Sequence, residues 1–284
     1  LGYRKETERV KKKGLRILAA AAVLTFGCLT MNAYAAEGWA LSNNIWTYLD
    51  KNGNRVTNEW KKGADNLWRY LNNSGEMAVN SWADNDYYVD ANGIMVADKW
   101  MQIVSPYSRD SQTYWFYFGS SGKVTKDTWK KIDGKSYYFD ADGIMQTGWT
   151  EDGDYYLSSS GAMVTGWRYL EPKDEDSSLY GTESDDGKYW FYFSASGKKQ
   201  SPSTSDDGGE YKVTKIDGKY YCFDADGRMR TGWVYLEGDP ENSSKNSIAD
   251  WRYFAESGIQ NATVGAAIPG WLSLNPPEQL QDNV

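Results

Sequence analysis

The sequence predicts an all-β fold, a β-solenoid built from stacked short hairpins. The first observation is an internal repeat: Trp129–Trp149 (WKKIDGKSYYFDADGIMQTGW) continues directly into Trp149–Trp167 (WTEDGDYYLSSSGAMVTGW), so the tryptophans are spaced by 20 and then 18 residues. Further copies span Trp39–Trp60, Trp60–Trp82 and Trp82–Trp100. A period of about 20 residues is typical of solenoids, in which one unit cannot bury its apolar face alone and neighbouring units stack to form the core.

Each copy carries the sequence signals of a β-hairpin. In the Trp129 copy, an aromatic run at 136–139 and a second run at 144–147 flank the turn Asp140–Gly143, so we expect two strands of about five residues that pair across it. The glycine supplies the positive φ that such a turn requires. Related turns are Asp50–Gly53, Asp90–Gly93 and Asp224–Gly227, and a methionine follows the turn glycine by two residues at Met77, Met95, Met145, Met163 and Met229.

The Asp-rich turns do not have the pattern of a calcium loop. An EF-hand loop places glycine sixth, after further oxygen ligands, whereas glycine is fourth here and an apolar residue such as Ile144 follows. We therefore interpret these aspartates as turn residues and predict no metal site.

Residues 1–35 have the three parts of a secretory signal peptide. Seven basic residues precede the apolar run Ile17–Leu29, and Ala33-Tyr34-Ala35 supplies a small-x-small cleavage site. The apolar run is short for a membrane span. We therefore expect cleavage after Ala35, a secreted mature protein, and no transmembrane segment after cleavage.

The expected mature chain is acidic and has one thiol. Residues 36–284 contain 24 Lys or Arg against 37 Asp or Glu, a net charge of −13, together with all 14 tryptophans and one cysteine, Cys222. This charge argues against nucleic acid as a partner, because affinity for nucleic acid comes from Lys and Arg that neutralise phosphates. A single cysteine cannot form an internal disulfide, so we expect stacking of the repeats to stabilise the fold.

The chain contains no histidine. Histidine is the commonest general base and metal ligand, so its absence excludes serine-type triads, cysteine–histidine pairs and imidazole zinc sites. Paired carboxylates can also hydrolyse a glycosidic bond, but the acidic residues here lie in turns and in the polar stretches 171–186 and 205–210. We therefore predict a protein that is not an enzyme, with no catalytic residues and no cofactor.

The order of these elements resembles a known repeat. A tryptophan, a short turn, an aromatic triplet, Gly-x-Met and Thr-Gly-Trp together look like the choline-binding or cell-wall-binding repeat of Gram-positive bacteria, which is similar to repeats in glucan-binding proteins and clostridial toxins. The resemblance covers roughly residues 37–271. It implies a left-handed β-solenoid with ligand cages between consecutive hairpins, and it does not select the ligand.

Strand alternation and the resemblance together indicate binding residues. Residues two apart share one face of a strand, which pairs Trp46 with Tyr48, Trp115 with Tyr117 and Trp190 with Tyr192. Rings of adjacent hairpins can enclose a quaternary ammonium group, attracted by about 0.5–2 kcal/mol per cation–π contact. By the resemblance, we predict one cage of Trp39, Trp46 and Tyr70 and a second of Trp60, Trp68 and Tyr88. The remaining candidates are Trp115, Tyr138, Trp190 and Trp251.

Packing is the alternative role for the same rings. A thin solenoid has little else with which to build a core, and aromatic side chains bury the most area per residue. Several copies also depart from the pattern. Asp86, Ser136 and Asp154 stand where other copies have Trp46 and Trp68, and Cys222 takes the position of Tyr138. We therefore expect binding at a subset of the junctions between hairpins.

Three polar inserts interrupt the repeat domain, which we place at 36–272. They cover about residues 103–113, 171–188 and 201–210, and we expect them to be surface loops. Near the end, Trp271–Pro276 resembles the stretch Trp167–Pro172, so we expect the sequence to stop as another unit begins. Residues 273–284 are then expected to be a disordered or truncated tail.

Three functions fit a secreted protein that is associated with the cell wall. The first is attachment to choline-like groups of teichoic acid, the second is binding of glucan or a host glycan, and the third is a structural spacer without a ligand. The expected partner is therefore a cell-wall polymer, choline-substituted teichoic acid or a glycan. The sequence does not indicate an oligomeric state.

Overall fold

The computed structural model describes residues 36–107, 111–173, 186–202, 211–236, 250–255 and 264–267. The expected signal peptide at 1–35, the segment 271–276, the tail at 273–284 and parts of the three inserts lie outside these residues. Contacts divide the chain into two compact units, residues 1–99 with 118–123 and residues 100–117 with 124–284.

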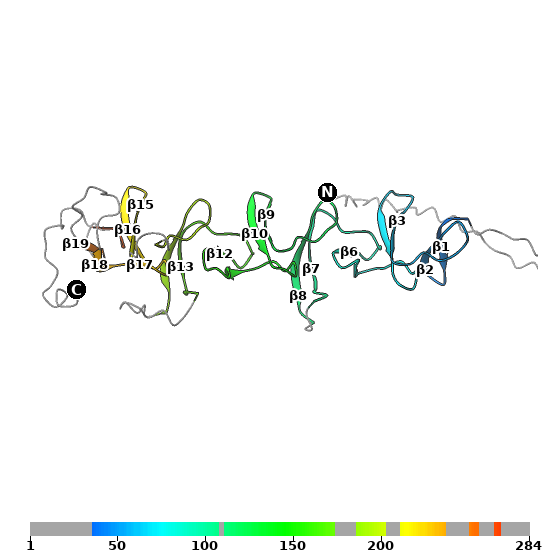
Figure 1. The fold of residues 1–284 in the computed structure, drawn as a ribbon, viewed down its shortest axis with the longest axis horizontal. Coiled ribbons are helices and arrows are strands. Elements are labelled where there is room, and N and C mark those ends of the chain that lie inside the picture. The colour runs from blue at the N-terminus through cyan, green and yellow to red at the C-terminus, as the bar shows by residue number, and fades with distance from the viewer. Residues whose placement is uncertain are drawn as a thin grey trace, which may run out of the picture. The chain divides into compact units, whose positions relative to one another are not determined.

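The described residues are all-β, as the sequence predicts. Every regular element among them is a strand, and each sheet pairs strands that are adjacent in the sequence (Figure 1). Within these residues, no helix is long and apolar enough to cross a membrane.

The first unit contains three hairpins, which we number 1–3. They pair β1 (Gly38–Ser42) with β2 (Ile45–Leu49), β3 (Glu59–Lys62) with β4 (Trp68–Leu71), and β5 (Ser81–Ala83) with β6 (Tyr87–Val89).

The second unit contains hairpins 4–9, apart from the end residues Lys99 and Phe118 of hairpin 4. They pair β7 (Lys99–Val104) with β8 (Thr113–Phe118), β9 (Thr128–Ile132) with β10 (Lys135–Phe139), β11 (Gly148–Trp149) with β12 (Tyr156–Leu157), β13 (Gly166–Leu170) with β14 (Tyr189–Phe193), β15 (Tyr211–Ile216) with β16 (Lys219–Asp224), and β18 (Gly232–Leu236) with β19 (Asp250–Phe254). A short strand, β17 (Met229–Arg230), also pairs with β16.

The hairpin turn lies earlier in the repeat than the sequence predicted. In hairpin 5 the strands are joined by Asp133 and Gly134, whose φ angles of 48° and 81° suit a type I′ turn. The expected second strand makes a single bridge, between Met145 and Phe139. The reason is Asp140, whose Oδ1 accepts the backbone N–H groups two and four residues further on, at 3.0 and 2.8 Å. This side-chain-capped turn leads the chain out of the hairpin.

In several of the described hairpins, the segment that follows the hairpin is hydrogen-bonded to the hairpin before it. In the second unit, the N–H of Met145 donates to the carbonyl of Trp115 in hairpin 4 at 2.9 Å, and Gln146 donates to Tyr138 of hairpin 5 at 2.9 Å. A two-stranded hairpin alone is marginally stable in water, so a hairpin with such bonds depends on its neighbour for stability. Equivalent bonds run from Met77 to Trp46 and Met95 to Trp68 in the first unit, and from Met163 to Ser136 and Lys199 to Asp154 in the second.

One strand position supplies eight of the fully buried core side chains. The residue directly after the tyrosine position of the second strand is fully buried in eight hairpins: Leu71, Val89, Phe118, Phe139, Leu157, Phe193, Phe223 and Phe254. Because side chains alternate along a strand, the tyrosine beside it faces the opposite side of the hairpin. A hairpin with this pattern therefore has a core-facing side and an opposite side that carries the tyrosine ring.

Candidate ligand-binding site

The first tryptophan of a hairpin lies between that hairpin and the next. Trp100 of hairpin 4 contacts Tyr117 on the paired strand, with ring centroids 5.2 Å apart, and Tyr137 of hairpin 5 at 4.9 Å. Trp115 lies 6.4 Å from Trp100, with the ring planes at 84°. These four rings, from two adjacent hairpins, form what we call the Trp100 cluster.

A second cluster repeats this geometry in hairpins 7 and 8. Trp167 lies 6.4 Å from Trp190 at an interplanar angle of 83°, 5.1 Å from Tyr192 and 4.8 Å from Tyr221. We call these residues the Trp167 cluster. Its three centroid distances agree with those of the Trp100 cluster to within 0.1 Å. The predicted pairing of Trp115 with Tyr117 and of Trp190 with Tyr192 is confirmed, because each pair contacts one tryptophan.

Other junctions contain smaller ring sets around the same tryptophan position. These contacts are Trp60 with Tyr70 and Tyr87 at 5.1 and 5.4 Å, Trp129 with Tyr138 and Tyr155 at 5.3 and 5.0 Å, and Trp149 with Tyr156 and Phe191 at 5.2 and 5.0 Å. A hydrogen bond to the next hairpin orients some of these indoles. The Nε1–H group of Trp149 donates to the carbonyl of Glu171 at 2.9 Å, and that of Trp39 donates to the carbonyl of Lys62 at 3.0 Å.

The second tryptophan of each cluster is accessible to solvent. Trp115 is 43% exposed and Trp190 is 42% exposed, whereas Trp100 and Trp167 are half-buried. The exposure of the two tryptophans in each cluster therefore differs by position. The first tryptophan packs between hairpins, and the second presents an open indole beside it.

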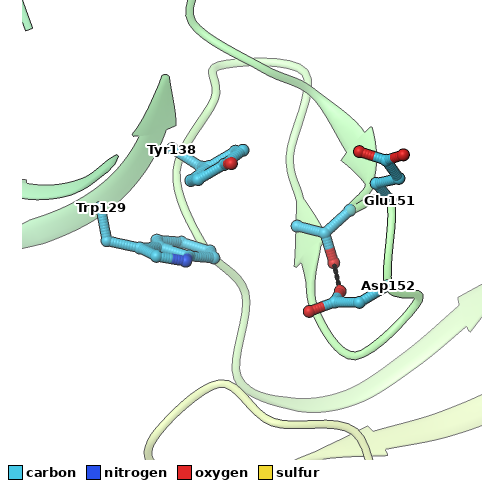
Figure 2. Close-up of a pocket in the computed structure, with 5 residues that line it drawn as sticks. Trp129, Tyr138, Glu151 and Asp152 are labelled. Carbon is cyan, nitrogen blue, oxygen red and sulfur yellow. Dashed lines mark hydrogen bonds between the residues drawn. The ribbon is translucent and has the colours of Figure 1, made fainter. Parts of the chain in front are cut away.

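A pocket of about 370 Å³ lies at the junction of hairpins 5 and 6, where Ser136 replaces the second tryptophan. Figure 2 shows the rings of Trp129 and Tyr138 on one side of this pocket and the carboxylates of Glu151 and Asp152 on the other. Aromatic faces and carboxylates both attract positive charge, so the lining suits a cation.

The electrostatics of the pocket favour an ionised Asp152 and a neutral Tyr138. Burial by itself raises the pKa of Asp152, but hydrogen bonds from the Thr150 hydroxyl at 2.5 Å and from the Asp154 N–H at 3.0 Å outweigh it, so this pKa lies below its ordinary value. Burial, helped by the nearby Asp127 carboxylate, raises the pKa of Tyr138. At neutral pH the pocket therefore combines neutral rings with negative charge.

The structure distributes the two predicted cages over neighbouring junctions. Trp39 contacts Tyr48 of its own hairpin at 5.5 Å, while Tyr70 contacts Trp60. Trp60 meets Tyr87 of hairpin 3, the residue before the predicted Tyr88, which packs against Trp82 at 5.8 Å.

The remaining predicted residues have different surroundings. Trp46 is half-buried, and Trp68 is exposed with the Lys62 ammonium 5.0 Å from its ring centroid. Trp115 and Trp190 lie in the two clusters, and Tyr138 lines the pocket. Trp251 lies in β19, opposite Tyr235.

The sequence reasoning missed the residue that the next hairpin contributes to each cluster. Tyr137 and Tyr221 each precede the tyrosine position of their hairpin, and they face the preceding tryptophan. The alternation of side chains along the strand was the signal that could have separated these two faces. Glu151 and Asp152 were also missed, because a turn residue in the sequence does not reveal which rings lie opposite it.

Junctions that lack the second tryptophan have different chemistry. Asp86 forms an ion pair with Lys123 at 3.2 Å in the first unit, and Asp154 forms one with Lys198 at 3.0 Å in the second. In hairpin 8, Val213 stands opposite Cys222, where hairpin 5 has Trp129 opposite Tyr138. Both members of the cross-strand ring pair are therefore replaced together in hairpin 8.

Comparison with protein families gives a match in two parts of the chain. A family model described as the choline-binding repeat matches residues 36–82 and 124–166. Residues 36–82 and 124–166 are therefore similar to choline-binding repeats. The matched residues include hairpins 1 and 2 of the first unit and hairpins 5 and 6 of the second. They contain the whole ring set of Trp129, and they contain Trp60 and Tyr70 but not Tyr87 of the Trp60 set.

Solved structures similar to this chain include three from Streptococcus pneumoniae. Choline-binding protein F is 20% identical, with 82% of this chain and 80% of that chain covered and a TM-score of 0.47. The choline-binding domain of CbpL is 25% identical, with coverages of 69% and 98% and a TM-score of 0.39. The modular autolysin LytC is 24% identical, with 76% of this chain covered and a TM-score of 0.40, and the match spans 51% of LytC. No curated protein matches the chain in sequence.

Proposed function

We propose that this chain is a secreted, non-catalytic protein that attaches to the bacterial cell envelope by binding choline-like groups of teichoic acid between its hairpins. The observation that carries the proposal is the recurrence of one four-ring geometry in the Trp100 and Trp167 clusters. A core alone requires buried rings, whereas each cluster also holds an indole that is more than two-fifths exposed.

A quaternary ammonium is the ligand that this chemistry suits best. It carries a positive charge but no N–H donor, so it needs aromatic faces more than hydrogen-bond acceptors. The pocket beside Trp129 adds two carboxylates to its rings, and the expected mature chain has a net charge of −13. Both features attract cations and disfavour anionic ligands.

The repeats supply an affinity that one junction lacks. At about 0.5–2 kcal/mol per cation–π contact, three rings give about 1.5–6 kcal/mol before the cost of association is subtracted. A single site is therefore weak, in about the millimolar range. Hairpins that stack as a solenoid place several such sites on one chain, and a polymer with repeated choline groups can engage them together.

Carbohydrate binding is the second candidate, and the exposure of Trp68, Trp115 and Trp190 favours it. A flat indole that is open to solvent can also stack on the apolar face of a sugar ring. Glucan or a host glycan would then occupy the exposed tryptophans rather than the space between hairpins.

Titration of tryptophan fluorescence separates these functions. The chain from residue 36 is titrated with choline and with a panel of small oligosaccharides. The proposal predicts saturable binding of choline in the millimolar range and release of cell-bound protein by choline. Competition by oligosaccharide without an effect of choline supports the glycan function, and absence of any saturable response supports a spacer.

Two variants identify the residues involved. Trp115→Ala removes the exposed ring of the Trp100 cluster, and we expect it to weaken choline binding. Tyr107→Ala is the matched control, because Tyr107 is similarly exposed but lies outside both clusters. Equal losses in the two variants would contradict binding at the cluster.

A further inference from the structure

Lys199 occupies a position that holds methionine in five other copies of the repeat. It follows the turn glycine Gly197 by two residues, as Met145 and Met163 follow theirs. Its backbone N–H donates to the carbonyl of Asp154 at 2.8 Å, and that of Met163 donates to the equivalent residue Ser136 at 2.8 Å. The backbone of Lys199 therefore has the same place in the fold as that of the methionines.

The stem of Lys199 also follows the path of a methionine side chain. A Cβ atom built on Gly265 would lie 2.1 Å from Sδ of Met229, and one built on Gly227 would lie 2.7 Å from Cδ of Lys199. Both side chains thus cover the glycine of the following turn. Lysine continues for two atoms beyond Cδ, and its methylene stem can pack as an apolar chain while the ammonium extends further.

The ammonium group of Lys199 lies over the indole of Trp149, with Nζ 5.3 Å from the ring centroid. Trp149 also contacts Tyr156 and Phe191, so the cation lies over one member of a set of packed aromatic rings. Tryptophan is the aromatic residue that binds a cation most strongly. At the Trp167 cluster the equivalent side chain is Met229, which packs on the same buried residues as Trp167 and carries no charge.

Charged groups around this junction are consistent with a bound cation. Burial lowers the pKa of Lys199, while the carboxylates of Asp226, Asp154 and Asp224 act in the opposite direction and Lys173 adds to the lowering. Asp154 is itself paired with Lys198 at 3.0 Å. The junction therefore combines aromatic rings and carboxylates with an ammonium group that takes the place of a cationic ligand.

We propose that Lys199 is an internal cation that closes the Trp149 junction to free ligand. The residue at this position of the repeat then determines whether the junction binds. A tethered ammonium is always at high local concentration, and it repels a second cation at the same rings. This inference rests on the proposed binding of choline-like cations. It predicts that replacing Lys199 by the residue of the other copies creates a binding site.

The test compares the number of choline molecules bound per chain, measured by isothermal titration calorimetry on the chain from residue 36. Lys199→Met is expected to bind one more equivalent of choline than the wild type. Lys199→Arg retains the charge and is expected to bind the wild-type number. Lys51→Met is the matched control, because Lys51 is an exposed turn residue and its replacement leaves the number unchanged.

A second measurement locates the additional site. Choline methyl protons should give nuclear Overhauser effects to the Trp149 indole in Lys199→Met and not in the wild type. Lys199→Gln also removes the charge, and it provides the same comparison if Lys199→Met does not fold. Equal numbers bound by wild type, Lys199→Met and Lys199→Gln overturn this inference alone. A wild-type chain that binds no choline overturns the proposed function, and the inference with it.

Discussion

The side chain of Met145 fills the space that a side chain at Gly161 would need. A Cβ atom on Gly161 would lie 2.3 Å from Sδ of Met145, and the φ angle of Gly161 is 78°. The same relationship joins Met163 to Gly197 and Met229 to Gly265. The Gly-x-Met spacing therefore reflects packing between successive turns, in which the methionine of one turn covers the glycine of the next.

Replacing Gly161 by alanine is expected to destabilise the second unit. The substitution combines a left-handed backbone, which costs about 1–2 kcal/mol for a residue with a Cβ, with an overlap against Met145 that adds about 1–3 kcal/mol. Gly134→Ala is the control, because Gly134 has a φ of 81° but nothing lies within 4 Å of its Cβ position. Urea unfolding should show the larger loss for Gly161→Ala, and equal losses would contradict the packing described here.

Variants of Phe193 and Trp190 should separate effects on stability from effects on choline binding. Phe193 is fully buried, so Phe193→Ala is expected to lower the free energy of unfolding by about 3–5 kcal/mol. Trp190→Ala removes a ring that is 42% exposed, and we expect a stability loss of about 1 kcal/mol or less. It should weaken choline binding at the Trp167 cluster by about 2- to 30-fold, the equivalent of one cation–π contact. Calorimetry and denaturation together measure both effects, and a Trp190→Ala protein with unaltered choline binding would argue for a packing role.

Much of the fold could be predicted from the sequence because the same signals recur in several copies of the repeat. Tryptophan spacing, Asp-Gly turns and aromatic runs each appear in several copies, so their agreement indicates stacked hairpins. The strand boundaries were harder to predict from the sequence. Asp133-Gly134 and Asp140–Gly143 are both good turns, and only the backbone shows that the first closes the hairpin while the second redirects the chain.

Strand alternation predicted some of the ring contacts between hairpins but not others, and ligand binding by these rings stays a prediction. Alternation placed Trp115 with Tyr117 and Trp190 with Tyr192, and these residues meet in the two clusters. The residue that the next hairpin contributes depends on which face of that hairpin turns toward the cluster. The sequence of one strand does not show which face this is. This is why Trp60 meets Tyr87 and the prediction named Tyr88.

The carboxylates of the pocket should strengthen cation binding beside Trp129. Glu151→Gln together with Asp152→Asn removes two negative charges from its lining, and we expect choline affinity there to fall by less than about tenfold, because exposed charges are screened by solvent and salt. The Trp129 indole N–H resonance, followed during a choline titration, reports this site separately. Asp133→Asn, in an exposed turn of the same hairpin, is the control. An unchanged response of Trp129 in the double variant would exclude a role for the two carboxylates.

Cys222 should be unreactive in the folded protein. Burial raises the pKa of its thiol to about 12, and the side chain packs with Val234, Leu236 and Phe254. Because the thiolate is the reactive form, its fraction at pH 8 is on the order of 1,000-fold lower than for an ordinary exposed cysteine. An aromatic disulfide reagent should therefore react with the chain from residue 36 only after unfolding in guanidinium. Rapid labelling under native conditions would contradict the buried position of Cys222.

The most direct measurement is the set of nuclear Overhauser effects between choline methyl protons and the aromatic protons of the chain from residue 36. We predict that choline contacts the rings of Trp100, Trp115, Trp167 and Trp190, which belong to the two clusters of matching geometry. Contacts confined to other surfaces, or none at saturating choline, would contradict the conclusion that rings of adjacent hairpins form the binding sites.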